Sequence, residues 1–266
     1  MLKINPQIVV KEISNFLKEY AIKANGFVLG LSGGIDSTVT AYLCAKVINP
    51  NNVLALIMPD PEVTPKNDVE DAINVAKTLS FQYRIIDISK ILNAFSLSIP
   101  DFSNKALVAV GNLRARIRMC LLYYYANLMN RIVVGTGDKS EILIGYFTKY
   151  GDGGVDILPL GDLYKTQVRM LGKYLGVPGE ILKKPSSPRL WKDQLAEEEL
   201  GLSYDIIDPI LYYLIDLKLN EIEISRKLNL PIEVILKVKR MIDRSRHKRE
   251  LPPIAKLPPE AFEYEK

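Results

Sequence analysis

The sequence predicts an α/β fold, a doubly wound parallel sheet with helices on both faces, followed by a C-terminal helical region. Four short apolar runs of strand length alternate with longer segments in which apolar side chains recur at helical spacing. The first apolar run stops in a Ser-Gly-Gly turn and restarts as a helix, which is the strand-to-helix junction of a βα unit. These two observations together favour βα units covered on both faces.

The elements follow one another in a regular order. A first helix is expected at about residues 6–24. The expected strands are FVLGL, VLALIM, YRIIDI and RIVVG, at residues 27–31, 53–58, 83–88 and 131–135. In such a sheet, ligands bind beyond the carboxyl ends of the strands, where the strand order reverses. The motifs SGGIDS (32–37) and GTGDKSE (135–141) are both expected at strand ends.

The second half of the chain is mostly helical. A long helix is expected at 104–130, with a basic patch at Arg114, Arg116 and Arg118 and then an apolar, aromatic half. Residues 221–242 have the outline of a helix-turn-helix, which we interpret as two amphipathic packing helices because no base-reading surface can be identified. We expect one domain over residues 1–266, its core sheet at about 26–180 and its C-terminal helices at about 204–250.

Two glycine-rich, proline-rich or charged segments are expected to be loops. GYFTKYGDGGVD at 145–156 and KKPSSPRLWKDQLAEEELGLS at 183–203 have the composition of exposed segments. Functional loops commonly have this character. We interpret them as two lids that order over a ligand.

Composition restricts the function classes. The chain has 266 residues, of which 48% are hydrophobic and 25% charged, so it can bury a sizeable core. It contains no run of about 18 apolar residues and no signal peptide, so a cytoplasmic protein without a membrane segment is expected. The net charge of +4, from 35 basic and 31 acidic residues, suits anionic small molecules and does not require nucleic acid.

The chain has few residues from which a catalytic nucleophile or a zinc–thiolate site could be built. His247 is the single histidine, which removes most Ser-His-Asp and Cys-His arrangements. Cys44 and Cys120 both lie in apolar helical patterns, so reduced core thiols are favoured over a disulfide or a zinc site. Hydrolysis through a protein nucleophile is therefore disfavoured.

The Ser-Gly-Gly turn has the chemistry of a phosphate site. Gly33 and Gly34 lack a Cβ and let an anion approach the main chain, while the next helix adds about half a positive charge at its N-terminus. Ser32 and Ser37 add hydroxyl donors. Asp36 fits beside phosphates if a magnesium ion lies between them. Neither GxxxxGK[ST] nor GxGxxG occurs at this turn.

SGGIDS resembles the pyrophosphatase loop of enzymes that split ATP into AMP and pyrophosphate. Four further motifs extend the resemblance: NLRARIRM at 112–119, VVGTGDKSE at 133–141, GYFTKYGDGGVDILPLGDLYKTQVR at 145–169 and KPSSPRLW at 184–191. Together they resemble the ammonia-dependent NAD synthetases, over about residues 27 to 248. The resemblance implies that the nicotinate carboxylate of deamido-NAD attacks ATP, and that ammonia then displaces AMP from the adenylate.

The same resemblance implies a set of site residues and no protein nucleophile. The implied ATP-binding residues are Gly30, Leu31, Ser32, Gly33, Gly34, Ile35, Asp36, Ser37, Thr136, Lys165 and Ser187. Asp36 and Glu141 are the implied Mg²⁺ ligands. The implied deamido-NAD-binding residues are Arg116, Lys149, Asp156, His247 and Lys248.

Several of these residues keep an alternative interpretation. Glu141 could be a first-turn acid favoured by the helix dipole, and Lys165 a solvated helix lysine. The arginines at 114–118 could form a solvated basic face, and His247 with Lys248 a solvated basic tail. The second lid also departs from the family, with Asp193 where glycine is common. In the loop MPDPEVTPKND, at 58–68, no residue is assigned.

The nitrogen donor and the assembly are further expectations. Since neither cysteine lies in a catalytic-looking turn, free ammonia is the predicted donor. The resemblance implies a homodimer, with residues 117–129 as an interface helix or a core helix. Two other hypotheses remain at this stage: another ATP pyrophosphatase, amidating or tRNA-modifying, and a non-catalytic adenine-nucleotide-binding module. The presence of both Asp36 and Glu141 favours turnover.

Overall fold

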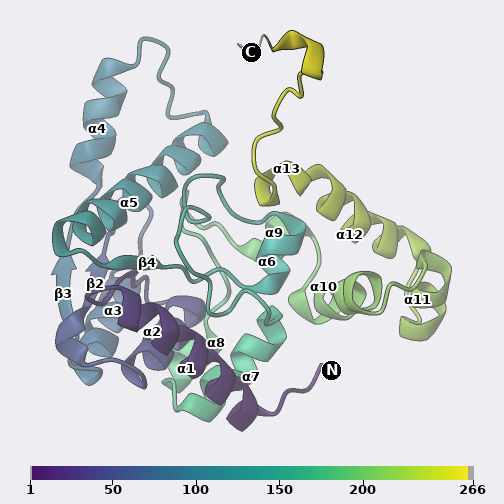
Figure 1. The fold of residues 1–266 in the computed structure, drawn as a ribbon, viewed down its shortest axis with the longest axis horizontal. Coiled ribbons are helices and arrows are strands. Elements are labelled where there is room, and N and C mark those ends of the chain that lie inside the picture. Colours follow the sequence, from purple (N-terminus) through teal and green to yellow (C-terminus); the bar gives the residue numbers. More distant parts are fainter. Residues whose placement is uncertain (1, 263–266) are drawn as a thin grey trace.

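A four-stranded parallel sheet forms the centre of the molecule. The computed structural model describes residues 2–262. The sheet has the order β3-β2-β1-β4. Its strands are β1 (Phe27–Gly30), β2 (Val53–Ile57), β3 (Gln82–Ile85) and β4 (Ile132–Val134). Helices cover the sheet on both sides (Figure 1). The predicted doubly wound α/β fold is therefore confirmed.

The helices lie close to the expected positions. The first runs from Pro6 to Lys23, and the long central helix begins three residues later than expected, at Leu107. The α-helices are α1 Pro6–Lys23, α2 Ile35–Ala45, α3 Lys66–Thr78, α4 Ser89–Ser98, α5 Leu107–Met129, α6 Lys139–Ile144, α7 Lys165–Leu175, α8 Gly179–Lys183, α9 Ala196–Leu200, α10 Tyr204–Leu211, α11 Glu221–Leu228, α12 Ile232–Arg244 and α13 Arg246–Arg249.

The strand order reverses beside β1. From β1 the chain moves outward through β2 to β3, and then returns to place β4 on the other side of β1. The register pairs Phe27 with Val53 on one side and with Ile132 on the other. The turns after β1 and β4 therefore meet at the topological switch point, where open α/β sheets bind their ligands.

Alternate strand residues build two cores, one on each face of the sheet. In β1, Phe27 and Leu29 pack with α1, α2, α3 and α7, whereas Val28 packs with α4 and α5. All three side chains are fully buried. Strands buried on both faces read as continuous apolar runs, which explains why FVL and VLALI show no polar alternation.

A third core joins the C-terminal helices to the sheet domain. Residues of α10, α11 and α12 pack around Ile144 of α6 and Tyr164, just before α7. The two helices of the helix-turn-helix outline pack on each other and on this core, as interpreted from the sequence. Figure 1 shows these helices on the side of the molecule away from β3, beyond α6.

Two expectations about exposure need correction. Cys44 is buried, but Cys120 is exposed, because it lies on the outward side of α5 and not on the side that packs against the sheet. The first lid is not wholly exposed either, since Thr148 and Gly151 are buried within it. Among residues 2–262, no helix is long and apolar enough to cross a bilayer. The cytoplasmic location stays a prediction.

Candidate functional site

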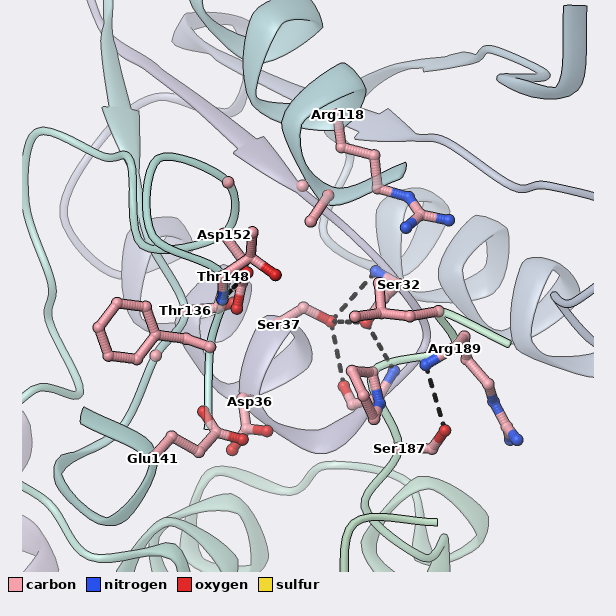
Figure 2. Close-up of a pocket in the computed structure, with 18 of the residues that line it drawn as sticks. Ser32, Asp36, Ser37, Arg118, Thr136, Glu141, Thr148, Asp152, Ser187 and Arg189 are labelled. Atoms are coloured by element: carbon pink, nitrogen blue, oxygen red, sulfur yellow. Dashed lines mark hydrogen bonds between the residues drawn. The ribbon is translucent and has the colours of Figure 1, made fainter. Parts of the chain in front are cut away.

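A cavity of about 450 Å³ lies at the carboxyl ends of β1 and β4. Its walls come from the turns after β1 and β4, the segment after β2, helix α5, and both predicted lids. Figure 2 shows polar side chains that line it, with Ser32 close to Ser37 and the carboxylate of Asp36 beside that of Glu141. The two sequence motifs at the switch point thus share one cavity.

The Ser-Gly-Gly turn is held by its own hydroxyl groups. The backbone N–H of Ser32 donates to Ser37 Oγ at 3.2 Å, and Ser37 Oγ donates to the carbonyl of Gly34 at 3.1 Å. Gly33 has φ +76°, which favours glycine, and a Cβ there would lie 2.1 Å from the Asp68 carbonyl oxygen. The turn is therefore packed into one shape, with the N-terminus of α2 at the cavity.

Three carboxylates meet beside this turn. Asp36 lies in the first turn of α2, and Asp138 is the N-cap of α6. Glu141 completes a capping box with Asp138, which fixes its position at the third residue of α6. One oxygen from each of the three lies within 4.8 Å of the others. Segments about 100 residues apart in the chain are thus brought into a single acidic cluster.

Lys165 fills the centre of the acidic cluster. Its Nζ lies 2.7 Å from Asp36 Oδ2 and 2.8 Å from oxygens of both Asp138 and Glu141. The side chain is 0% exposed. The predicted alternative of a solvated helix lysine is therefore wrong.

Burial and the neighbouring charges shift the pKa values of the acidic cluster in opposite directions. Burial raises the pKa of Asp138 to about 6 despite the opposing charge of Lys165. Burial also raises the pKa of Glu141 well above its usual value. Burial alone would lower the pKa of Lys165, but the neighbouring carboxylates raise it well above its ordinary range. A single cation faces three acids, so the cluster favours additional positive charge.

The donor set suits a magnesium ion. Carboxylate oxygens are the ligands that Mg²⁺ prefers, together with substrate phosphate oxygens. Asp36 Oδ1 is buried and has no hydrogen-bond partner within the described part of the chain. A buried carboxylate oxygen without a partner is costly, and a cation would satisfy it.

Helix α10 holds the helices of the acidic cluster in place through the carboxylate of Asp208. Asp208 is fully buried and accepts hydrogen bonds from Ser140 Oγ at 2.6 Å and from the Thr166 N–H at 2.8 Å. Ser140 Oγ in turn accepts from the Lys165 N–H at 2.9 Å. The carboxylate thus joins the first turns of α6 and α7, which carry Glu141 and Lys165.

The basic patch of α5 is split between the interior and the surface. Arg114 is buried and its Nε lies 2.6 Å from Asp60 Oδ2. Arg118 lines the cavity and donates through Nε to the Met58 carbonyl at 3.0 Å. Burial lowers the pKa of Arg118 to about 10, which leaves it charged at neutral pH. Arg116 is exposed. A solvated basic face is therefore wrong for Arg114 and Arg118.

Arg118 is a cavity residue to which the sequence interpretation assigned no role, and the buried Asp60–Arg114 pair beside it was not expected either. The spacing of Arg114 and Arg118 by four residues, which places both on one helix face, could have separated them from Arg116. Asp60, which follows β2, is fully buried. Nothing in the local sequence pairs it with an arginine 54 residues away.

The cavity includes most of the residues implied for ATP. The lining residues among them are Gly30, Leu31, Ser32, Gly34, Ile35, Asp36, Ser37, Thr136 and Ser187. Gly33 packs against α3, and Lys165 is buried at the centre of the acidic cluster, so neither lines the cavity. Glu141, the second implied metal ligand, also lines the cavity. The roles of these residues stay predictions, but the residues lie in or next to a single cavity.

The residues implied for deamido-NAD are more scattered. Lys248 lines the cavity and donates to the carbonyls of Gly145 and Phe147, both at 2.6 Å, so it is not part of a solvated tail. The other four do not line the cavity. Arg116, Lys149 and His247 form a chain of contacts outside it, in which Arg116 Nη2 donates to the Lys149 carbonyl at 3.3 Å and Lys149 Nζ to the His247 carbonyl at 2.6 Å.

Asp156 lies apart from this group. Its Oδ2 accepts from the Val133 N–H at 2.7 Å and its Oδ1 from the Tyr123 hydroxyl at 3.0 Å. These contacts place it beside β4 and α5, near the end of the first lid. Its assignment to the substrate stays a prediction.

Comparisons with known proteins match nearly the whole chain. Residues 9–252 match the family model described as NAD synthase. An NH(3)-dependent NAD(+) synthetase of Hyperthermus butylicus is 50% identical over 258 residues, covering 95% of this chain and 92% of that protein. These matches cover both switch-point motifs and both lids.

Two solved structures have the same fold over nearly the whole chain. The NMN synthetase of Francisella tularensis has a TM-score of 0.84 and 38% identity, covering 96% of this chain and all of that one. The NH3-dependent NAD synthetase of Campylobacter jejuni has a TM-score of 0.80 and 34% identity, covering 95% of this chain and all of that one. With a family model matched over most of its length, a relative at 50% identity and this shared fold, the chain belongs to the NAD synthase family.

Proposed function

We propose that the protein makes NAD from deamido-NAD, ATP and ammonia, and releases AMP and pyrophosphate. The observation that carries the proposal is the meeting of a phosphate-binding turn and an acidic cluster in one cavity at the switch point. A nucleotide-binding module would need the turn, but it would not need carboxylates that can hold a cation over the phosphates. The family and the names of the curated relatives support the same activity.

The chemistry requires activation before amidation. A carboxylate is a poor electrophile, because its leaving group would be oxide or hydroxide. In the proposed reaction, a nicotinate carboxylate oxygen attacks the α-phosphorus of ATP, and the bond to pyrophosphate breaks. Ammonia then attacks the carbonyl carbon, and AMP leaves with the oxygen. Such chemistry is mostly positioning and charge stabilisation.

The residues of the cavity supply that positioning. The hydroxyls of Ser32 and Ser37, which line the cavity, would contact the phosphates, together with the N-terminus of α2. Asp36 and Glu141 would hold a magnesium ion. A bound Mg²⁺ neutralises the charge that develops on the phosphate oxygens. No step in this scheme needs a protein nucleophile.

The positions of the two cysteines support free ammonia as the nitrogen donor. Burial raises the pKa of Cys44 to about 12, so its thiol stays protonated. Cys120 is exposed on α5 and is not among the residues that line the cavity. Neither thiol is placed to release ammonia from glutamine at the reacting carboxylate.

A second candidate substrate is the deamido mononucleotide. The cavity must hold ATP and the nicotinate end of the substrate, whereas Arg116, Lys149 and His247 lie outside it. A substrate without the distal AMP would not need those residues, and a similar structure is named an NMN synthetase. Comparing kcat/KM for deamido-NAD and nicotinate mononucleotide tests the choice; a higher value for deamido-NAD supports the first candidate.

We also propose that the protein acts as a homodimer through helix α5. The outward side of this helix exposes Tyr124 at 61% and Leu128 at 66%. Exposed apolar side chains that gather on one face mark interaction surfaces. If the site draws on both copies, dilution that dissociates the dimer lowers the activity per chain. Constant specific activity in a demonstrated monomer would refute the assembly.

Finally, we propose that residues 1–266 act as one domain. Asp208 of α10 ties the C-terminal helices to α6 and α7, directly beneath the acidic cluster. Removal of the C-terminal helices would therefore be expected to disturb the site as well as the third core.

A further inference from the structure

The second lid is tied to helix α3 through one buried carboxylate. Asp68, in the first turn of α3, is 4% exposed. Its Oδ1 lies 2.7 Å from Lys184 Nζ and its Oδ2 lies 2.9 Å from Arg189 Nε. Both cations belong to the second lid, in its non-helical part between α8 and α9, residues 184–195. Two lid residues five positions apart therefore share one anchor.

The same anchor contacts the phosphate-binding turn. Gly33 packs so closely on α3 that a Cβ would lie 2.1 Å from the Asp68 carbonyl oxygen. Lys184 Nζ also donates to the Gly33 carbonyl at 3.1 Å. Asp68 is thus the point at which the turn after β1, helix α3 and the second lid meet, and Lys184 and Arg189 reach it from the cavity wall.

The position of Ser187 follows from these contacts. The Arg189 N–H donates to Ser187 Oγ at 3.2 Å (Figure 2). Ser187 Oγ in turn donates to the Gln194 carbonyl at 2.6 Å. Arg189 has φ +51°, a left-handed conformation that costs free energy for a residue with a Cβ. Such a conformation persists where surrounding contacts hold it, and the ion pair with Asp68 is one such contact.

The two lid cations, Lys184 and Arg189, differ in the carboxylates that they contact. Lys184 has a second carboxylate partner, Asp71, at 2.5 Å. Within residues 2–262, the ion-pair partner of Arg189 is Asp68. Loss of Asp71 would leave both lid cations on Asp68, whereas loss of the Asp68 charge would release Arg189. Buried charge pairs of this kind are sensitive to removal of one partner.

We propose that Asp68 is a positioning residue, which holds the second lid against the Ser-Gly-Gly turn so that Ser187 faces the nucleotide. The inference rests on the proposed function for the identity of the nucleotide, ATP. It assigns Asp68 no direct part in the chemistry. It acts through Arg189 and Lys184, and its effect is therefore on ATP binding more than on the rate after binding.

The test uses Asp68→Asn, which removes the charge at nearly constant shape, with Asp71→Asn as the matched control. Asp68→Asn should weaken ATP binding about tenfold, measured by titration calorimetry with Mg²⁺ and without deamido-NAD, and kcat at saturating ATP should change much less. Asp71→Asn should change the ATP affinity much less than Asp68→Asn does. Arg189→Gln should match Asp68→Asn, and the double variant Asp68→Asn/Arg189→Gln should add little to either.

The rate of limited proteolysis measures directly how well the second lid is held in place. Without nucleotide, trypsin should cleave after Arg189 and Lys192 faster in Asp68→Asn than in the wild type or in Asp71→Asn. Asp68→Glu, which keeps the charge, should restore at least part of the protection. The proteolysis result does not depend on amidation, so it separates a failure of this inference from a failure of the proposed function.

Two results would overturn the inference. One is unchanged ATP affinity and lid cleavage in Asp68→Asn. The other is cleavage that rises equally at sites throughout the chain, because general destabilisation of the fold, and not release of the lid, would then explain the change.

Discussion

Lys165 Nζ lies 2.7 Å from Asp36 Oδ2, although 129 residues separate them in the chain. The ammonium group also contacts Asp138 and Glu141, and its side chain is fully buried. Helix α2 supplies Asp36, the N-terminus of α6 supplies the other two acids, and α7 supplies the lysine. The contact therefore forms only when three separate helices, α2, α6 and α7, are packed in their native positions.

Replacing Lys165 by methionine should leave three neighbouring carboxylates without their cation. We expect the free energy of unfolding to fall by about 3–5 kcal/mol, as is typical when one partner of a buried ion pair is removed. Mg²⁺ should restore part of this loss, since it can replace the missing charge.

Thermal unfolding with and without MgCl₂ measures both effects. Lys139→Met is the matched control, because Lys139 pairs with Asp162 and Asp216 outside the acidic cluster. An equal rise of Tm with Mg²⁺ in the wild type and both variants would contradict the prediction.

Asp36→Ala and Glu141→Ala should each retain the fold and lose on the order of a thousandfold in turnover. Each variant lacks a carboxylate that we assign to Mg²⁺, so the metal is less well held over the phosphates. Steady-state rates as a function of Mg²⁺ concentration measure the effect, with circular dichroism as a check on folding. Near-normal turnover in either variant would remove that residue from the metal site.

Gly33→Ala should destabilise the protein, whereas Gly34→Ala should have little effect on stability. Gly33 has φ +76° and a Cβ there would meet the Asp68 carbonyl oxygen at 2.1 Å; Gly34 has φ −88° and a Cβ there would lie 3.3 Å from Ser32 Oγ. The left-handed conformation alone costs about 1–2 kcal/mol for alanine. Urea unfolding of the two variants compares them directly, and equal stabilities would count against the close packing of the turn on α3.

Asp208→Asn should make the protein less stable at neutral pH by about 1–3 kcal/mol. Ser140 Oγ and the Thr166 N–H both donate to the carboxylate, and one of them would face the amide NH₂ group instead of an acceptor. Urea unfolding at pH 7 measures the loss. An unchanged free energy of unfolding would show that Asp208 does not hold α6 and α7 together.

The difference in stability between the wild type and Asp208→Asn should depend on pH, and the pKa of Asp208 sets the direction of that dependence. Burial raises the pKa of Asp208, so the native state holds its proton at a higher pH than the unfolded chain does. The contribution of this group to stability therefore decreases as pH rises from about 4, the unfolded value, to the raised native value, and is constant above it. The advantage of the wild type over Asp208→Asn should therefore shrink across that interval and keep its smaller, constant value at neutral pH; an advantage that grows with pH would contradict the sign.

The sequence was sufficient for the features that depend on local pattern. Apolar runs and helical periodicity predict the sheet, and glycines at a strand-to-helix junction predict the phosphate-binding turn. The strand order β3-β2-β1-β4 then brings SGGIDS and GTGDKSE together, as the general behaviour of doubly wound sheets predicts. The expected strands differ from the observed ones by at most three residues at either end.

The remaining features depend on which elements meet in space. From its local sequence, Lys165 cannot be distinguished from an ordinary solvated helix lysine. Its buried position follows from the packing of α7 against α2 and α6. Cys120 lies in an apolar run but on the exposed side of α5, since part of that apolar surface faces away from the sheet. Asp60 forms its buried ion pair with Arg114, which is 54 residues away in the chain. No local pattern encodes such contacts.

The most direct test is to incubate the purified protein with ATP, Mg²⁺, deamido-NAD and ammonium, and to quantify NAD, AMP and pyrophosphate, with deamido-NAD omitted in a parallel control. The account predicts equal yields of the three products, and none of them in the control. Absence of ATP cleavage in the complete mixture would contradict the proposed function. AMP and pyrophosphate without NAD would contradict the assignment of free ammonia as the nitrogen donor.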